Sequence, residues 1–331
     1  MTLLIVIPTL NEAAHIRGVL SALLADAPAD ALAVVADGGS TDGTPDIVRA
    51  LMPEEPRLRL IHNPRRLQSA GINLAVDLLG DGRSHLLRAD AHAAYPPGFV
   101  PALLEEMAST GAASVTVGME TVAVDAFTKG VAAAQNSLLG TGGSAHRMGS
   151  GGRYVDHGHH ALMRLEAFRA VGGYDPTQSH NEDAELDHRL RRAGWAIWLT
   201  GRVRIRYMPR RSLPALFRQY RAHGRGRAET VMKHGLALKP RQMAPALVPV
   251  AVALAGLGLA LSVRDAGWLM LAGPAALWAG LCLSYGAGLA IKAREAAVLW
   301  SGPAAMAMHL GWGIGFLARR LTFRRFAKIV A

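Results

Sequence analysis

Cysteine is almost absent from this chain: its 331 residues include only Cys282. A single cysteine excludes an intrachain disulfide, and we therefore expect the soluble part of the protein to face the reducing cytosol. The first residues, MTLLIVIPTLNE, lack the basic segment of a secretory signal, and their apolar run stops at Pro8. We interpret this stretch as a buried strand and not as a signal peptide.

Charged side chains are nearly absent from the C-terminal third. None lies between Arg241 and Arg264, between Asp265 and Lys292, or between Glu295 and Arg319. Each gap is long enough for the roughly 20 apolar residues that cross a bilayer. We therefore expect a transmembrane region over 243–318, with about three segments (243–263, 268–291 and 296–318), and a basic tail over 319–331.

The distribution of Lys and Arg does not fix how many times the chain crosses the membrane. Three crossings would place the basic tail outside the cell, against the tendency of Lys and Arg to stay on the cytoplasmic side. Either the first segment, which contains Pro245 and Pro249, is re-entrant or shallow, or the tail is an exception.

Positive charge is in excess, with a formal net charge of +11. From Arg202 to Arg241, twelve Lys and Arg residues stand against one acid, Glu229, so the excess lies just before the first apolar segment. Such a position favours the cytoplasmic membrane surface and anionic head groups. We expect no nucleic-acid partner, because no aromatic stacking platform accompanies the charge. Residues 209–242 are predicted to form juxtamembrane interface helices, amphipathic over 213–234.

The first hundred residues alternate short apolar runs with helical patterns. This rhythm predicts a mostly parallel sheet covered by helices on both faces, with the ligand beyond the carboxyl ends of the strands. The expected strands are 3–7, 31–36, 58–62 and 84–89, and the expected helices are 16–24, 45–52 and 70–79. Further elements are expected within 110–122 (strands), 126–137 and 182–193 (helices) and 195–199 (a strand).

Polar residues follow the first two expected strands. After the first, Asn11 and Glu12 fit a structural role, as a helix cap and a first-turn acid, as well as they fit a role in a binding site. After the second comes DGGSTDGTPD, whose end is a good helix start. That start leaves Asp37 unexplained, and its carboxylate is well placed to accept hydrogen bonds from a base or a ribose. Asp42 is ambiguous, because a turn would also favour it.

Two later stretches carry candidate chemistry. In RADAH, Arg88, Asp90 and His92 are two apart, so an extended chain points them to one side. An acid and an imidazole on one side can face a divalent cation, although short strings of this kind also arise by chance. In HNED, Glu182 and Asp183 are either first-turn acids of a helix or a carboxylate base at the mouth of a site.

Taken in order, IPTLNE, DGGSTDGT, RADAH and HNEDAEL resemble the motifs of family-2 glycosyltransferases of GT-A fold. YPPG, GGYD and HLGWGIGFL are similar to stretches of the membrane-anchored bacterial members. The resemblance implies an α/β, doubly wound mixed sheet of the nucleotide-diphospho-sugar transferase type. Residues 1–208 would form this catalytic domain in the cytosol, on a multi-pass protein of the bacterial inner membrane.

The resemblance also implies roles for single residues. Asp183 matches the catalytic base and is preceded by Glu182, while Asp90 matches the first acid of an Asp-x-Asp metal motif whose second acid is replaced by His92. Imidazole suits Mn²⁺ better than Mg²⁺, so the identity of the divalent metal stays open. The expected nucleotide-sugar-binding residues are Pro8, Thr9, Glu12, Asp37, Gly39, Asp42, Arg88 and Asp90. Arg218, Gln219 and Arg221 faintly resemble a Gln-x-x-Arg-Trp signature and are expected to contact diphosphate or lipid.

The activity implied is an inverting transfer of a hexose, with glucose and UDP as expectations, from a nucleotide sugar to a polyprenyl-diphosphate-linked saccharide in exopolysaccharide or cell-surface glycan synthesis. Direct glycosylation of polyprenyl phosphate, in the manner of dolichyl-phosphate mannose synthases, is the competing enzyme class. A membrane nucleotide-binding or scaffold subunit without catalysis is a third alternative.

Overall fold

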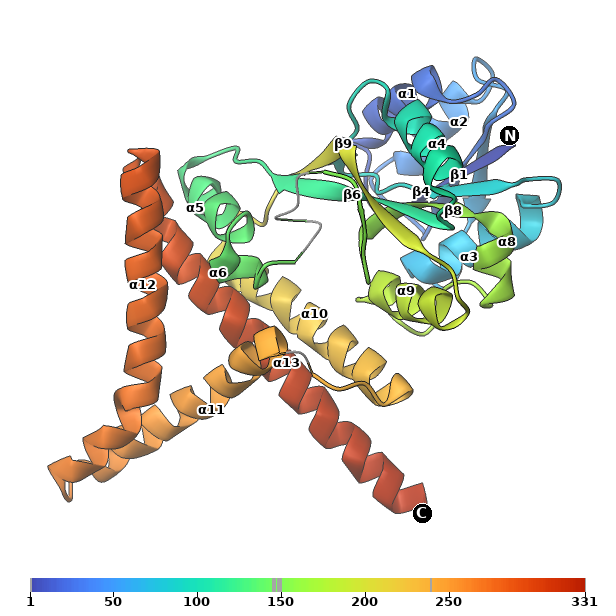
Figure 1. The fold of residues 1–331 in the computed structure, drawn as a ribbon. Coiled ribbons are helices and arrows are strands. Elements are labelled where there is room, and N and C mark those ends of the chain that lie inside the picture. Colours follow the sequence, from blue (N-terminus) through green and yellow to red (C-terminus); the bar gives the residue numbers. More distant parts are fainter. Residues whose placement is uncertain (1, 145–146, 148–150, 239, 331) are drawn as a thin grey trace. The chain divides into compact units, whose positions relative to one another are not determined.

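The computed structural model describes residues 2–144, 147, 151–238 and 240–330. The chain divides into two compact units (Figure 1). The first comprises Met1–Glu120 and Ser144–Tyr207, and the second comprises Thr121–Gly143 and Met208–Ala331. The first unit ends at Tyr207, and residues 121–143 group with the C-terminal unit.

The first unit is built on a mixed sheet with the order β3-β2-β1-β4-β8-β6-β9-β5, to which β7 adds by pairing with β9. β1 to β4 pair in parallel where they are neighbours, whereas β8 is antiparallel to β4 and β6. This arrangement confirms the expected α/β mixed sheet. The strands are β1 (Leu3–Thr9), β2 (Leu32–Asp37), β3 (Leu58–His62), β4 (His85–Arg88), β5 (Ala93–Ala94), β6 (Ser114–Thr121), β7 (Arg153–Tyr154), β8 (His159–Arg164) and β9 (Ile197–Tyr207).

Apolar side chains fill both faces of this sheet. Every residue of β1 is buried, as expected for a central parallel strand whose run is continuously apolar. One core packs against α1 (Ile16–Asp26), α2 (Thr44–Leu51) and α4 (Phe99–Thr110). The other packs against α3 (Gln68–Leu79), α8 (Leu165–Ala170) and α9 (Glu182–Arg192) (Figure 1). The carboxyl ends of β1, β2 and β4 therefore meet at one edge.

Two sequence expectations about element ends are wrong. Asn11 does not cap α1, which begins five residues later at Ile16, because Asn11 adopts a left-handed φ of 60° in the preceding loop. The strand expected at 195–199 continues to Tyr207, since Val203 and Ile205 face inward between the exposed Arg202, Arg204 and Arg206. The alternation is that of a half-buried strand, which the run of arginines concealed.

The second unit is helical. Its elements are α5 (Ala126–Gln135), α6 (Leu138–Thr141), α10 (Leu213–His234), α11 (Pro240–Leu261), η1 (Ala266–Ala272), α12 (Gly273–Ala293), η2 (Ala296–Trp300) and α13 (Ser301–Val330). α10 is one continuous helix capped by Ser212, whose Oγ accepts from the N–H of Ala215.

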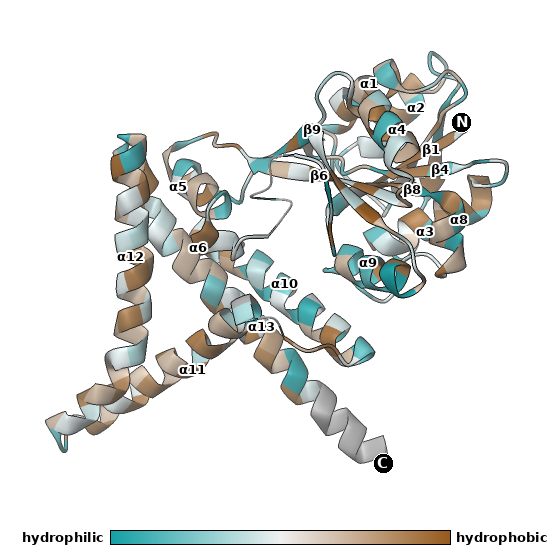
Figure 2. Cartoon of the chain, viewed as in Figure 1, coloured by the Kyte–Doolittle hydropathy of each residue, from teal (hydrophilic) through white to brown (hydrophobic). Residues whose placement is uncertain are grey.

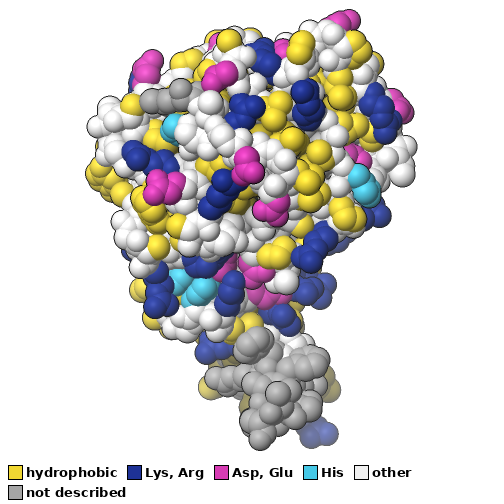
Figure 3. All heavy atoms as spheres, turned by 90° about the vertical axis from the view of Figure 1, so that its right-hand side faces the viewer, with side chains coloured by type: hydrophobic (Ala, Val, Ile, Leu, Met, Phe, Trp, Pro, Cys, Tyr) yellow, Lys and Arg dark blue, Asp and Glu magenta, His cyan; other side chains and the backbone are white. Residues whose placement is uncertain are grey.

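Two stretches among the described residues are long and apolar enough to cross a membrane, Gln242–Leu261 and Ala266–Ala293. Only 17% and 6% of their apolar windows are buried, so neither is a core helix of a soluble domain. Both are predominantly apolar in Figure 2. Figure 3 shows the face on the right-hand side of Figure 1. In contrast to the two apolar stretches, this face carries interspersed basic and acidic side chains.

The third expected segment, 296–318, forms η2 and the first part of α13. Ala304, Ala305 and Met308 of α13 are fully buried against α5 and α10. The glycines of HLGWGIGFL explain this packing: a Cβ on Gly315 would lie 1.9 Å from the carbonyl oxygen of Arg221 in α10, and one on Gly313 would lie 2.2 Å from that of Pro245 in α11. Small residues permit such close approach of helices.

Candidate active site

The loops that follow β1 and β2 are connected by hydrogen bonds. Asn11 donates its N–H to the Oγ of Ser40 (2.8 Å), and its Oδ1 accepts from the N–H of Thr41 (2.9 Å). The Oγ1 of Thr44 accepts from the N–H of Glu12 (2.9 Å). IPTLNE and DGGSTDGT therefore form one wall at the edge of the sheet.

Asp37 lies inside this wall and is 5% exposed. Its Oδ2 accepts from the N–H groups of Gly39 (2.9 Å) and Ser40 (3.0 Å), and its Oδ1 from the hydroxyl groups of Ser40 (2.5 Å) and Thr9 (3.3 Å). Gly39 adopts a φ of 84°, which permits this turn. The carboxylate thus shapes the loop, and its role toward a nucleoside stays a prediction, as do those of Pro8, Thr9 and Gly39.

Asp42 also connects the two loops. Its Oδ2 accepts from the N–H of Ala13 (2.9 Å) and its Oδ1 from the hydroxyl of Thr44 (2.5 Å). The hydrogen bond from Thr44 is the main cause that lowers the pKa of Asp42 below its ordinary value. A turn-forming role, one of the two alternatives for Asp42, accounts for all of these contacts.

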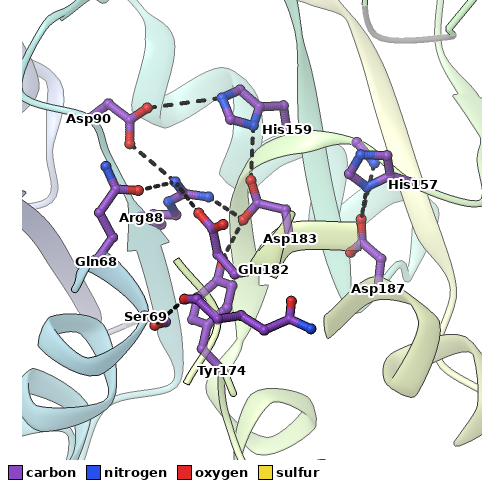
Figure 4. Close-up of polar contacts among 12 residues, drawn as sticks. Gln68, Ser69, Arg88, Asp90, His157, His159, Tyr174, Glu182, Asp183 and Asp187 are labelled. Atoms are coloured by element: carbon purple, nitrogen blue, oxygen red, sulfur yellow. Dashed lines mark hydrogen bonds and ion pairs between the residues drawn. The ribbon is translucent and has the colours of Figure 1, made fainter. Parts of the chain in front are cut away.

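Arg88 is the centre of a buried polar network where β4 ends (Figure 4). Its side chain is 2% exposed, and its Nη1 pairs with the Oδ1 of Asp183. Its Nη2 lies 2.9 Å from Gln68 Oε1, 3.3 Å from Glu182 Oε1 and 3.4 Å from Asp90 Oδ1. β4, α3 and the first turn of α9 therefore contribute to one site.

Negative charge exceeds positive charge in this network, since three carboxylates surround one guanidinium. Burial, reinforced by the neighbouring carboxylate of Asp183, raises the pKa of Glu182 to about 7 from its ordinary 4.5. Burial opposes the charged form of Arg88 too, but Asp183 and Asp90 outweigh it and raise the pKa of Arg88 well above its ordinary value. The site therefore favours an additional cation.

Asp183 receives hydrogen bonds on both carboxylate oxygens. Besides Arg88, the Oη of Tyr174 donates to its Oδ1 at 2.9 Å, and the Nδ1 of His159 lies 2.9 Å from its Oδ2. The residue sits in the first turn of α9, where the helix dipole favours an anion. The structure thus brings together Arg88, Asp90, Glu182 and Asp183, as the order of the motifs indicated.

Three residues of the network were not predicted from the sequence: Gln68, His159 and Tyr174. Tyr174 stood inside the noted GGYD stretch, but nothing assigned its hydroxyl to the site. His159 begins β8 and follows His157 at a spacing of two, which was the available signal. Gln68 opens α3 and carries no pattern that distinguishes it from a surface residue.

The described residues contain no group of three or more His, Cys, Asp or Glu side chains that could hold a metal ion. Asp90 Oδ2 lies 3.9 Å from His159 Nε2, while the Nδ1 of His92 lies 3.0 Å from Glu12 Oε1. A carboxylate and an imidazole, in a site with excess negative charge, are ligand types that fit a divalent cation. The metal role of His92 and the nucleotide role of Glu12 stay predictions.

Arg218, Gln219 and Arg221 belong to α10 of the second unit. Arg218 and Arg221 are exposed, and Arg225 continues the same exposed face one turn further. Their expected contact with diphosphate or lipid stays a prediction.

Comparison with known proteins agrees with the motifs. The family model described as glycosyl transferase family 2 matches residues 4–172. The chain is 48% identical over 323 residues to the succinoglycan biosynthesis protein ExoA of Rhizobium meliloti (strain 1021), covering 97% of this chain and 96% of that protein.

A solved structure shares the fold. The mannosyltransferase PcManGT from Pyrobaculum calidifontis, in complex with GDP-Man and Mn²⁺, aligns with a TM-score of 0.59 over 96% of this chain and 86% of that one. At 20% identity this likeness concerns the fold alone. The family match and the ExoA-like sequence carry the assignment: the chain belongs to glycosyl transferase family 2.

Proposed function

We propose that this protein is an inverting, metal-dependent glycosyltransferase that moves a hexose from a nucleotide diphosphate sugar to a polyprenyl-diphosphate-linked saccharide at the cytoplasmic face of the bacterial inner membrane. The observation that carries the proposal is the Asp183 carboxylate, held on both oxygens beside Asp90. Similarity to a succinoglycan biosynthesis protein supports a place in exopolysaccharide synthesis.

Asp183 is the base in this mechanism. It accepts the proton of the acceptor hydroxyl as that oxygen attacks the anomeric carbon, and the nucleotide diphosphate leaves from the opposite face. Arg88 and Tyr174 both bind Oδ1, and we take Oδ2, which His159 contacts at 2.9 Å, as the oxygen that receives the proton. One displacement inverts the anomeric configuration without a covalent sugar–enzyme intermediate.

Asp90 and His92 would hold the divalent cation, which supplies positive charge against the diphosphate when bound. Glu182 and Arg88 set the net charge around that position. The guanidinium of Arg88 balances the acids, and Glu182, with a pKa of about 7, exchanges between its protonated and ionised forms near neutral pH. Glu12, Asp37, Asp42 and the turn at Gly39 form the wall for the nucleotide. UDP-glucose is the first donor to test.

The second unit supports a membrane-bound acceptor. Two exposed apolar helical stretches suit a bilayer, and the exposed arginines of α10 suit the phosphates of a lipid-linked substrate. Two crossings would also return the basic tail to the cytoplasmic side, which removes the conflict created by three.

The base is tested with Asp183→Asn in purified, detergent-solubilised protein. We expect transfer to fall at least about 100-fold, the scale of general-base catalysis, with nucleotide affinity nearly unchanged. Asp187→Asn, one turn along α9, is the control for damage to the helix. Full transfer by Asp183→Asn would refute the assignment.

A donor and acceptor screen tests the rest. Labelled nucleotide sugars are offered with Mn²⁺, Mg²⁺ or EDTA, and with either bare polyprenyl phosphate or a polyprenyl-diphosphate saccharide. We expect product only with metal and only on the saccharide acceptor, with a β-linkage from an α-donor. Product on bare polyprenyl phosphate would assign the competing enzyme class, and absence of any transfer or donor hydrolysis would favour a non-catalytic subunit.

A further inference from the structure

Two histidines near the start of β8 contact two acids of α9. The Nδ1 of His157 lies 2.8 Å from Asp187 Oδ2, and the Nδ1 of His159 lies 2.9 Å from Asp183 Oδ2 (Figure 4). Side chains two apart on an extended chain repeat after about 6.6 Å, and those four apart on a helix lie about 6 Å apart on one face. The two histidines therefore match the two acids in register.

The backbone fixes where these imidazoles point. His159 pairs with Val117 of β6, and the register of this pairing shifts between Thr116 and Val117. Such irregularities commonly redirect side chains beside active sites. Gly158 permits the close approach, because a Cβ there would lie 2.1 Å from the Oγ1 of Thr116. His159 is thus set by the sheet and not by a mobile loop.

We propose that His159 is a positioning residue that orients the Oδ2 of Asp183 toward the acceptor hydroxyl; the proposal rests on Asp183 being the base. Facing an ionised carboxylate, the Nδ1 of His159 must be the donor, since the carboxylate can only accept. Arg88 and Tyr174 both act on Oδ1. The contact from His159 to Oδ2 adds to these, and together they fix the rotation of the carboxylate about its last bond.

The position of His159 agrees with such a role. Its side chain is 26% exposed and stands at the rim of the site, whereas that of Asp183 is 13% exposed. Its Nε2 lies 3.9 Å from Asp90 Oδ2, so the imidazole ring spans the distance between the base and the acid expected to hold the cation. Small displacements of a base are costly, because about 1 Å of misplacement can lower a rate 100-fold.

The test compares His159→Asn with His159→Gln. The amide nitrogen of Asn reaches the position of Nδ1, whereas that of Gln reaches the position of Nε2. We expect His159→Asn to keep kcat within about threefold of wild type, and His159→Gln and His159→Ala to lose roughly 30- to 100-fold, with the donor KM and nucleotide affinity unchanged. A merely structural role would not separate Asn from Gln in this way.

His157 supplies the matched control, because it makes the same kind of contact one helical turn from the base. We expect His157→Asn and His157→Ala to lower the melting temperature but to change kcat less than threefold. Titration calorimetry with the nucleoside diphosphate confirms that each variant retains a folded site.

The outcomes separate this inference from the proposed function. Wild-type kcat in His159→Ala, while Asp183→Asn is inactive, would overturn the role of His159 alone. Retention of activity by Gln and its loss in Asn would also overturn it, since the acting atom would then be Nε2. Activity in Asp183→Asn would overturn the proposed base itself.

Discussion

Replacement of Arg88 by Met removes one cation from among three acids with little change in side-chain volume. Arg88 is 2% exposed and contacts Asp90, Glu182 and Asp183. Water therefore cannot take its place in stabilising the negative charge of these acids. Breaking a buried ion pair from one side costs about 3–5 kcal/mol, mainly because the remaining charge stays buried. The prediction concerns the free energy of unfolding of the first unit.

The lower end of that range applies here. Glu182 already has a pKa of about 7, and loss of the guanidinium that lowers it would raise it further, so this acid neutralises instead of remaining as an unpaired charge. We therefore expect a loss of about 3 kcal/mol, or roughly 6–12 °C in melting temperature for a unit of this size. Adding Glu182→Gln to Arg88→Met should recover part of this loss.

Thermal unfolding of the full chain in detergent, followed by circular dichroism at pH 8 with EDTA, measures the effect. Arg169→Met is the control, because Arg169 makes a surface ion pair with Asp81 at 2.9 Å and such pairs contribute under about 1 kcal/mol. If Arg88→Met melts within error of Arg169→Met, the network does not depend on its guanidinium and the charge argument fails.

Two further predictions concern Glu182 and Gly315. The pKa of Glu182 rises from 4.5 in the unfolded chain to about 7 on folding, so between these values the native state binds one more proton than the unfolded state. The free energy of unfolding therefore falls as the pH rises through this window, by roughly 3 kcal/mol in total at about 1.4 kcal/mol per pKa unit. Glu182→Gln should lack this loss in unfolding titrations with EDTA from pH 5 to 8; parallel curves would contradict the assignment. Gly315→Ala should separate α10 from α13 and lower the free energy of unfolding by about 1–3 kcal/mol or more, because the added Cβ would meet a backbone oxygen. Gly280→Ala is the control: its added Cβ would meet nothing within 4 Å, so it should be neutral in the same melts.

Much of the site edge was predictable from sequence because local periodicity and topology are linked. Apolar runs ending in IPTLNE, DGGSTDGT and RADAH indicated strands, and parallel strands bring their carboxyl ends to one edge. Asp90 and Asp183 were identified on this basis together with the family resemblance. The contacts of Arg88 were not, since it pairs with Asp183 across 95 residues and spacing carries no information at that separation.

Absence of charge alone did not distinguish the third expected membrane segment from the first two. The segment 296–318 is as poorly charged as its neighbours, but Ala304, Ala305 and Met308 are buried within the protein. This segment is not among the two described stretches that are apolar enough to cross a membrane, and the glycines of α13 permit the close backbone approach by which it packs on α10 and α11.

The sequence by itself determined the family, the α/β class, the apolar C-terminal third and the acids expected at the strand ends, because each is a property of neighbouring residues. Only the tertiary structure decided which groups satisfy those acids. Asp37 and Asp42 accept hydrogen bonds from their own loop and also from Thr9 and Ala13 of the segment around the end of β1. Asp183 is held by Arg88 and by the imidazole of His159 from β8. Hydrogen bonds between distant segments depend on how the chain folds in space, and the order of residues does not encode them locally.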